Sequence, residues 1–269
     1  MEGFNNMYRG RIFFMGLAIL SLSLISGFVW NGTAFGANKA DLGKKVYEER
    51  CMICHGAKGD GKGLVSVMRK SEKSGRVILV EPRDFTNGVF RFRSTATGCL
   101  PSDEDLLRLV DTGITRSFMP AHKDELNMDE KKAVIEQIKT FSTRWKEEEP
   151  CKSITVKKKP KWVGSSSSIE KGAKIYKEMK CWECHGDDGR GKGPKSDQLK
   201  DDWGKPIVPF NFTAGALKRG TGAEDVYITF MSGLDGTGMP SYEDSLKEDD
   251  RWHLVSFTLK LMGLDKHVH

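Results

Sequence analysis

Apolar side chains recur at helical spacing near the end of each half of this chain. The two stripes are Ile135, Ile138 and Phe141 within residues 129–145, and Trp252, Val255 and Leu259 within residues 247–261. Spacings of three and four residues place such side chains on one face of an α-helix. Residues 103–111 and 224–231 show helical spacing as well. The pattern therefore predicts a mainly α-helical protein with related elements in its two halves.

A shorter helix is predicted over residues 41–50, where Gly43 and Tyr47 stand four residues apart and share one face. The second half repeats this pair as Gly172 and Tyr176. A glycine lets a neighbouring backbone approach closely, so both pairs indicate tight helix packing. Further matched segments extend the repeat, and the offset between the halves falls from 130 to 120 residues along the chain.

The first half carries the pattern C-x-x-C-H at residues 51–55, and the second half repeats it at residues 181–185. This pattern is the attachment sequence of a c-type haem. Two thiols on one turn add to the haem vinyl groups, and the adjacent imidazole becomes the proximal ligand of the iron. The residues concerned are Cys51, Cys54, His55, Cys181, Cys184 and His185. Two matched copies predict two covalently bound haem c groups.

Other chemistry uses parts of this pattern. A thioredoxin-like redox pair has C-x-x-C near a βαβ unit and needs no adjacent histidine. A four-cysteine zinc site would have to join pairs 130 residues apart, and it leaves both histidines unexplained. The glycine-rich turns at residues 56–63 and 186–193 follow no strand and lack the ending of a P-loop. We expect these turns to let the backbone pass close to a flat porphyrin.

Length and composition fit an exported protein of two domains. The 269 residues are 38% hydrophobic and 30% charged, which is enough chain for two domains of about 100–150 residues. Arg9 and Arg11 precede an uncharged apolar run over residues 12–30, and small residues follow. This order predicts a secretory signal with a cleavage site at residues 34–36. The alternative is an uncleaved anchor, because nineteen apolar residues are long enough to span a bilayer.

Haem attachment to two thiols belongs to compartments outside the cytoplasm, so we expect the periplasm or an equivalent location. Removing residues 1–36 lowers the formal net charge from +6 to +5, and the four propionates of two haems offset most of the remainder. We therefore expect no nucleic-acid partner, and membrane contact only through an uncleaved leader. Lysine and serine runs between the halves are typical of a solvated linker. The expected division is a leader over 1–37, a first domain over 38–151, a linker over 152–168 and a second domain over 169–269.

The second axial position of each iron separates electron carriers from enzymes. A Met-Pro pair follows six residues after a matched glycine in each half, at Met119 and Met239. A methionine thioether favours ferrous iron and raises its potential. The shared place of both methionines, ahead of the last helix, predicts that they are the ligands rather than core residues. The competing candidates are His122 and His253.

With C-x-x-C-H early and Met-Pro late, each half resembles a class I cytochrome c domain, over residues 41–145 and 168–262. The whole chain therefore resembles a dihaem cytochrome c built of two tandem domains. Residues 82–86, 90–95 and 199–204 are similar to small cytochromes that accompany molybdenum oxidoreductases, including nitrite-oxidising ones. This narrower likeness implies a class of partner only.

The resemblance also implies a role for two arginines. Arg93 and Arg219 occupy matching places in the repeat. By analogy with the family they pair with haem propionates, since a guanidinium suits a carboxylate. The alternative is that both are ordinary surface arginines.

Two cysteines depart from the family pattern. Cys99 lies in a six-residue insertion of the first half, between Thr95 and Asp105, and Cys151 follows that half's last predicted helix. An even number of cysteines remains after haem attachment and the expected compartment is oxidising, so we predict a disulfide between them. The alternative is a thiolate ligand from Cys99 to a haem iron, which would lower its potential and indicate sulfur-compound chemistry.

Together these features predict an electron-transfer protein rather than an enzyme. If His and Met fill both axial sites, no substrate binds at iron, and the haems carry the redox chemistry. The protein then carries single electrons between a periplasmic oxidoreductase, such as the molybdenum class, and a respiratory acceptor, such as a terminal oxidase or another cytochrome. Two rivals stay open: a haem enzyme of the dihaem peroxidase or thiosulfate dehydrogenase type, and an electron-relay subunit fixed in a larger oxidoreductase complex.

Overall fold

The computed structural model describes residues 31–71 and 77–267. The predicted leader falls mostly on residues 1–30 and to that extent lies outside the described residues. The chain divides into two compact units, residues 1–38 and 39–269, and both C-x-x-C-H motifs belong to the second. Within the described residues, no helix combines the length and the apolar character needed to cross a bilayer.

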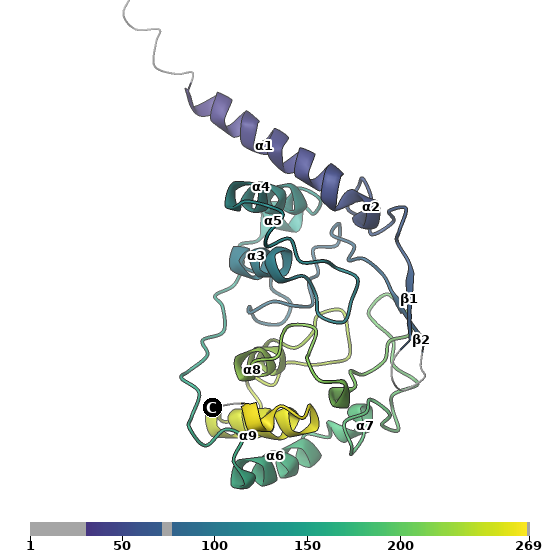
Figure 1. Ribbon diagram of the computed structural model, residues 1–269, viewed down its shortest axis with the longest axis vertical. Helices are drawn as coiled ribbons and strands as arrows, with labels where there is room; N and C mark the ends of the chain where they lie inside the picture. The colour runs from purple at the N-terminus through teal and green to yellow at the C-terminus, as the bar shows by residue number, and fades with distance from the viewer. Residues whose placement is uncertain (1–30, 72–76, 268–269) are drawn as a thin grey trace, which may run out of the picture. The chain divides into compact units, whose positions relative to one another are not determined.

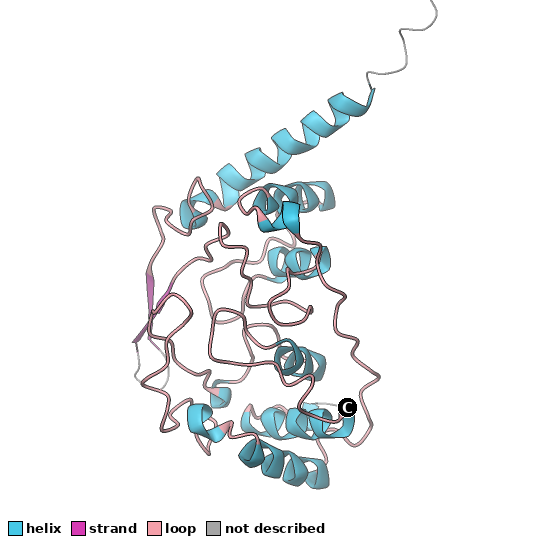
Figure 2. Ribbon diagram, turned by 180° about the vertical axis from the view of Figure 1, so that it is seen from behind, coloured by secondary structure: helices cyan, strands magenta, loops and turns pink. Residues whose placement is uncertain are grey.

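Helices form nearly all of the regular structure, as the hydrophobic pattern predicts (Figure 1). The elements of the first half are α1 (Asn31–Arg50), α2 (Met52–His55), α3 (Asp103–Thr112), α4 (Met128–Lys139) and α5 (Arg144–Glu147). Those of the second half are α6 (Ser166–Glu178), α7 (Trp182–His185), the 3-10 turn η1 (Phe212–Ala214), α8 (Ala223–Ser232), α9 (Glu248–Leu261) and η2 (Asp265–His267). Long loops join these helices (Figure 2). The order α1, α2, α3, α4 thus returns as α6, α7, α8, α9, which is the repeat that the sequence predicts.

Capping residues explain where two helices of the first half begin. Ser102 and Asp105 exchange side-chain and backbone hydrogen bonds at the start of α3, and Asn127 and Glu130 do the same at the start of α4. Such reciprocal bonds satisfy backbone N–H groups that have no partner inside the helix.

The helix predicted over residues 129–145 is instead divided into α4 and α5. Thr140 bonds the carbonyl of Gln137 through its backbone N at 3.2 Å and through Oγ1 at 2.7 Å. Bonds from residue i to i−3 tighten the last turn and end the regular helix. Phe141 then turns toward Gly59, where an added Cβ would lie 2.6 Å from its ring.

A short antiparallel strand pair is absent from the sequence prediction. β1 (Met68–Ser71) pairs with β2 (Val77–Val80), with Met68 opposite Val80. The run Val77–Val80 has the aliphatic, β-branched composition that favours strands. Four residues are too few for a periodic signal, so the hairpin could not be read from the hydrophobic pattern.

Each half has its own hydrophobic core, and the predicted helix stripes contribute to it. The first core includes Val46, Tyr47, Phe85, Leu106, Val134, Ile135 and Ile138. The second includes Tyr176, Phe212, Tyr227, Trp252, Leu254, Val255 and Leu259.

The matched glycines lie where helices touch. An added Cβ at Gly43 would be 2.3 Å from the carbonyl oxygen of Ala133 in α4. At Gly172 it would be 2.0 Å from the carbonyl oxygen of His253 in α9. The tight packing predicted from the Gly/Tyr pairs is confirmed, and Figure 1 shows α6 beside α9.

The segment expected as a solvated linker is partly packed against both halves. Ile154 N donates to Ser94 O at 2.7 Å, and Val163 is buried in the second core. Ser165 caps α6, so the serine run starts a helix rather than continuing a tether. Ser168 in that run is buried and donates to Ser256 Oγ at 2.7 Å. Small hydroxyl side chains satisfy one another here inside a helix pair, which composition alone does not reveal.

Candidate functional site

The first C-x-x-C-H motif begins directly after α1. Cys51 N still bonds the carbonyl of Tyr47 at 2.9 Å, and α2 then carries the motif to His55. The His55 ring is buried, stacks on Phe85 at 4.4 Å, and its Nδ1 lies 3.0 Å from the carbonyl oxygen of Arg83. Since a carbonyl can only accept, Nδ1 carries the proton and Nε2 holds the lone pair that binds a metal.

The second motif has the same construction. His185 Nδ1 lies 3.0 Å from the carbonyl oxygen of Phe210, and its ring stacks on Phe212 at 4.5 Å. Burial lowers the pKa of both His55 and His185, although the carbonyl bonds oppose this. Each imidazole is therefore neutral near pH 7, which is the form that ligates iron.

A tyrosine in each half anchors the turn after the motif. Tyr47 Oη donates to Gly56 O and Tyr176 Oη donates to Gly186 O, both at 2.7 Å. The turn then folds back on the motif, and an added Cβ at Gly63 would lie 2.3 Å from the carbonyl oxygen of Ile53. At Gly59 an added Cβ would instead meet the ring of Phe141, so the turn packs against both backbone and side chains. A close approach of these glycines to a porphyrin stays a prediction.

The four motif cysteines form no disulfide with one another. Burial raises the pKa of Cys51 and of Cys181 to about 11. Redox-active C-x-x-C pairs need a lowered thiol pKa, so this environment argues against thioredoxin-like exchange. Between residues 31 and 267, outside the gap at 72–76, no group of three or more His, Cys, Asp or Glu side chains is placed to hold a metal ion.

A cavity opens in the second half beside its motif. Cys181, Cys184 and His185 line one part of it, Met239 another, and most of the remaining wall is aliphatic and aromatic. Arg219 also lines it, with Nε and Nη1 buried and without a hydrogen-bond partner among the described residues. Two thiols, an imidazole, a thioether, an apolar wall and a buried cation fit a haem with its carboxylates.

The two Met-Pro segments adopt the same loop. Ile114 N donates to Met119 O at 3.2 Å, and Leu234 N donates to Met239 O at 3.1 Å. Each methionine N in turn donates to a hydroxyl two residues earlier, that of Ser117 or Thr237. Met239 lines the same cavity as His185, and both methionines are partly buried. Their ligation of iron stays a prediction.

The two competing histidines have other contacts. His122 Nδ1 lies 3.1 Å from Glu125 Oε2. His253 in α9 faces α6, with Nδ1 2.9 Å from Ser168 Oγ and its ring 4.3 Å from that of Trp162. Neither of them lines the cavity in the second half.

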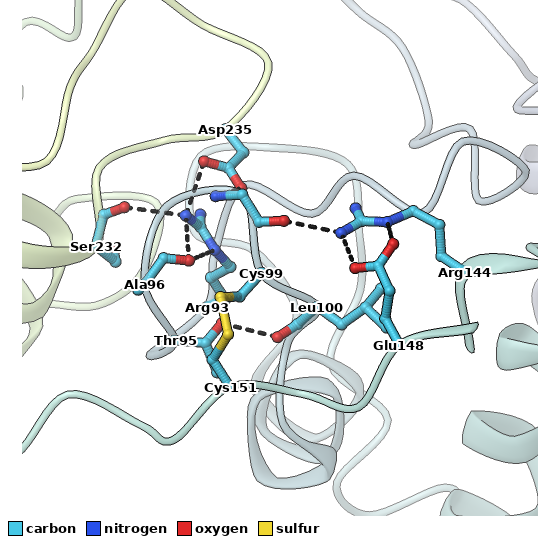
Figure 3. Close-up of a disulfide and its surroundings, with 11 residues drawn as sticks. Arg93, Thr95, Ala96, Cys99, Leu100, Arg144, Glu148, Cys151, Ser232 and Asp235 are labelled. Carbon is cyan, nitrogen blue, oxygen red and sulfur yellow. Dashed lines mark hydrogen bonds and ion pairs between the residues drawn. A yellow bond between two sulfur atoms is a disulfide. The ribbon is translucent and has the colours of Figure 1, made fainter. Parts of the chain in front are cut away.

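Arg93 has protein partners that the family likeness does not imply. Its side chain is fully buried, and its guanidinium donates to Ala96 O, to Ser232 O and to Asp235 Oδ1, the last at 2.7 Å (Figure 3). The guanidinium also donates to Phe90 O at 3.4 Å. Ser232 and Asp235 belong to the second half. The surface-arginine alternative is therefore wrong for Arg93, and this side chain joins the two halves. No sequence signal marks a partner 142 residues away.

The structure joins Cys99 to Cys151 by a disulfide, with Cα atoms 5.8 Å apart (Figure 3). The loop around Cys99 also contacts the second half, through Thr97 Oγ1 to Ser232 O and Gly98 N to Asp235 Oδ2, both at 2.9 Å. The disulfide thus holds the insertion where it meets the second half. It leaves no Cys99 thiolate for a haem iron.

We expect the double variant Cys99→Ser/Cys151→Ser to unfold more easily while it keeps both haems. The sulfur atoms close a loop of 52 residues, and the chain-entropy account assigns about 4 kcal/mol to a loop of that size. Denaturant titration should show a loss of this order. A thiol reductant should reproduce the loss in the wild type and do nothing further to the variant. If the reductant leaves wild-type stability unchanged, the bridge does not form in solution.

The comparisons with known proteins agree with this geometry. Residues 169–261 match the cytochrome c family, and residues 38–138 match the family of cytochrome c oxidase, cbb3-type, subunit III. Among solved structures, a chain of the reducing HAO-like protein complex of Kuenenia stuttgartiensis is 39% identical, with 82% of this chain and 96% of that chain covered and a TM-score of 0.75. No curated protein matches the chain.

Helical halves, repeated C-x-x-C-H motifs and the family matches lead to one conclusion. Cys51 and Cys54 in the first half, and Cys181 and Cys184 in the second, each have the spacing that attaches a haem. The chain belongs to the dihaem c-type cytochromes: it is an electron-transfer haem protein of two cytochrome c domains, with one covalent haem c in each.

Proposed function

We propose that the protein is a periplasmic dihaem cytochrome c that passes single electrons between an oxidoreductase and a respiratory acceptor, with both irons held by His and Met. His55 and Met119 would serve the first haem, and His185 and Met239 the second. The observation that supports this best is the shared construction of the two halves. Each has one histidine fixed by a backbone carbonyl and one methionine in the same hydrogen-bonded loop.

Residues beside each haem site would orient its histidine ligand and exclude water and substrate from its iron. When bound, each haem supplies a one-electron iron couple. The carbonyls of Arg83 and Phe210 hold the histidine rings in one orientation and make Nε2 a stronger donor. The stacked rings of Phe85 and Phe212 exclude water from the histidine side. The methionine loops would close the opposite side, so that no substrate reaches iron and only electrons cross.

The haem-enzyme alternative requires a different axial ligation of one iron. An enzyme of the peroxidase or thiosulfate dehydrogenase type needs one iron that is open or bound by thiolate. Turnover of peroxide or thiosulfate by the purified dihaem protein would support that alternative. If the protein is an electron carrier, it should turn over neither peroxide nor thiosulfate. Each haem should instead take up one electron reversibly from a chemical reductant.

The complex that contains the similar solved chain indicates which redox partner this protein could have. That chain belongs to a reducing HAO-like protein complex, and it shares 39% identity over most of its length. This favours an HAO-like oxidoreductase as the redox partner over the molybdenum class. The membership of that chain in a complex also favours the alternative in which this protein is an electron-relay subunit. Co-purification at a fixed stoichiometry would indicate a complex subunit, and a partner lost on dilution would indicate a free carrier.

Exposed apolar side chains in and after the first motif are a suitable contact surface for that partner. Ile53 is 53% exposed, Val65 is 39% exposed, and Leu64 next to Val65 in the sequence is 95% exposed. Ile53 and Val65 are linked through their backbone at 2.9 Å, and Lys58 and Lys62, which lie between them in the sequence, are exposed. The second half has the same backbone link at 2.8 Å, but it carries an ion pair between Glu183 and Lys195. The first half thus fits a partner whose apolar surface is bordered by carboxylates.

The variant Ile53→Glu/Val65→Lys copies the second-half ion pair into the first half. We expect it to bind the partner oxidoreductase about tenfold more weakly, because it loses apolar contact at the centre of the interface. The reciprocal variant Glu183→Ile/Lys195→Val is the matched control and should bind normally. Both keep the motif cysteines and should carry two haems by mass. Equal affinities for the two variants would mean that the partner contacts another surface.

The periplasmic location is supported by the chemistry of the cysteines. A disulfide in the first half and four cysteines with haem-attachment spacing both suit an oxidising compartment. Fractionation of cells that express the full chain tests this, and the mass of the mature protein shows whether residues 1–37 are removed.

A further inference from the structure

The carbonyl that holds His185 belongs to a residue whose side chain contacts the first half. The ring centroid of Phe210 lies 5.4 Å from Cζ of Arg116, a distance at which a cation is attracted to an aromatic face. Arg116 Nη1 also donates to Ala214 O at 2.8 Å, and Phe210 lines the cavity beside His185. Arg116 thus joins the first half to the segment that presents a carbonyl to this histidine.

The same arrangement occurs in the opposite direction. The carbonyl that holds His55 belongs to Arg83, whose Cζ lies 5.4 Å from the ring centroid of Trp203 in the second half. Burial lowers the pKa of Arg83 to about 10, so its guanidinium stays a cation near pH 7. The Trp203 ring packs over Gly236, where an added Cβ would lie 2.6 Å from it.

Arg116 and Gly236 occupy matching places in the two Met-Pro loops, three residues before the methionine. Both have a left-handed backbone, with φ of 61° and 73°. Glycine adopts this conformation without strain, whereas a residue with a Cβ does not. The first half therefore keeps a strained arginine that reaches the second half. Strain held at such a position points to a role for the side chain.

We propose that each half positions the haem-ligating histidine of the other half. Arg116 acts on His185 through Phe210, and Trp203 acts on His55 through Arg83. This rests on the proposed function, in which both histidines bind iron. The bond to the carbonyl sets the orientation and donor strength of each imidazole, so a contact that fixes the residue bearing the carbonyl also fixes the ligand. Because Arg116 lies in the first Met-Pro loop, that loop is tied to the histidine of the second haem.

The test measures how fast the Nδ1 proton of each histidine exchanges with solvent in the reduced dihaem protein, by NMR of protein with isotope-labelled histidine. Contacts with the stacked rings of Phe85 and Phe212 assign the two signals. Arg116→Gly removes the backbone strain and should fold normally. Its His185 proton should nevertheless exchange about fivefold faster, which corresponds to the loss of one cation–π contact of ~1 kcal/mol. Its His55 proton should keep the wild-type rate.

Trp203→Ala should give the crossed result, with faster exchange at His55 and the wild-type rate at His185. Arg116→Lys keeps a cation and Trp203→Phe keeps a ring, so each should restore most of the wild-type rate. Phe118→Ala is the matched control, because Phe118 is an exposed side chain of the same loop as Arg116. This variant should change neither rate.

Faster exchange in the half that carries the substitution, in both halves equally or in neither half would overturn the inference. Failure of the proposed function would look different. The reduced wild-type protein would then lack two separate, slowly exchanging signals from iron-bound histidine.

Discussion

Replacing Met239 with alanine is expected to open the second iron to added ligands such as cyanide or imidazole and to lower its potential. The thioether stabilises ferrous iron, and axial ligand identity spans roughly 0.8 V across haem proteins, so a fall on the order of 0.1 V is expected. Met119→Ala should do the same to the first haem alone. Optical and magnetic spectra of each variant, with and without ligand, measure both effects.

Met262 provides the control for this pair. It is a buried methionine of the second core, 5% exposed, and no part of the cavity wall. Met262→Ala should cost about 2–5 kcal/mol of stability through the space it leaves, with the spectra of both haems unchanged. If Met239→Ala behaves in the same way, Met239 is a core residue and the iron has another ligand.

Gly172→Ala is expected to be among the most destabilising single substitutions in the chain. The added methyl carbon would lie 2.0 Å from the carbonyl oxygen of His253, and 2.8 Å from Cβ of Phe257. Backbone cannot retreat without separating α6 from α9, so we expect a loss of about 3 kcal/mol or more. Thermal or denaturant unfolding of the haem-loaded protein measures it.

Lys174→Ala on the exposed face of α6 is the control, because surface substitutions usually change stability by less than about 0.5 kcal/mol. Gly43→Ala tests the same packing in the first half, where the approach to Ala133 is 2.3 Å. A wild-type melting curve for Gly172→Ala would mean that the helices lie farther apart than described.

Local sequence patterns were sufficient to predict most helices and the haem-attachment motifs. The helix stripes, the Gly/Tyr pairs and the C-x-x-C-H motifs each depend on residues a few positions apart. Their chemistry is therefore visible in the sequence. The division of the helix at Thr140 and the short hairpin at Val77–Val80 were missed, since each depends on a few residues with no periodic signal.

Contacts between distant segments were not predictable in the same way. The family likeness places Arg93 and Arg219 in equivalent roles, yet Arg93 meets Asp235 and Arg219 faces the cavity. That difference depends on where the two halves meet, and on the insertion held by Cys99. The serine run at the start of α6 shows the same limit, because its partner Ser256 is 88 residues away from Ser168.

The protein is expected to hold two covalent haems, each closed by a histidine and a methionine. Low-temperature magnetic spectra of the purified oxidised protein, with its intact mass, test this most directly. We predict a mass with two thioether-linked haems and only low-spin signals typical of His/Met iron. A mass with a single haem, or a high-spin signal from one resting iron, would contradict it.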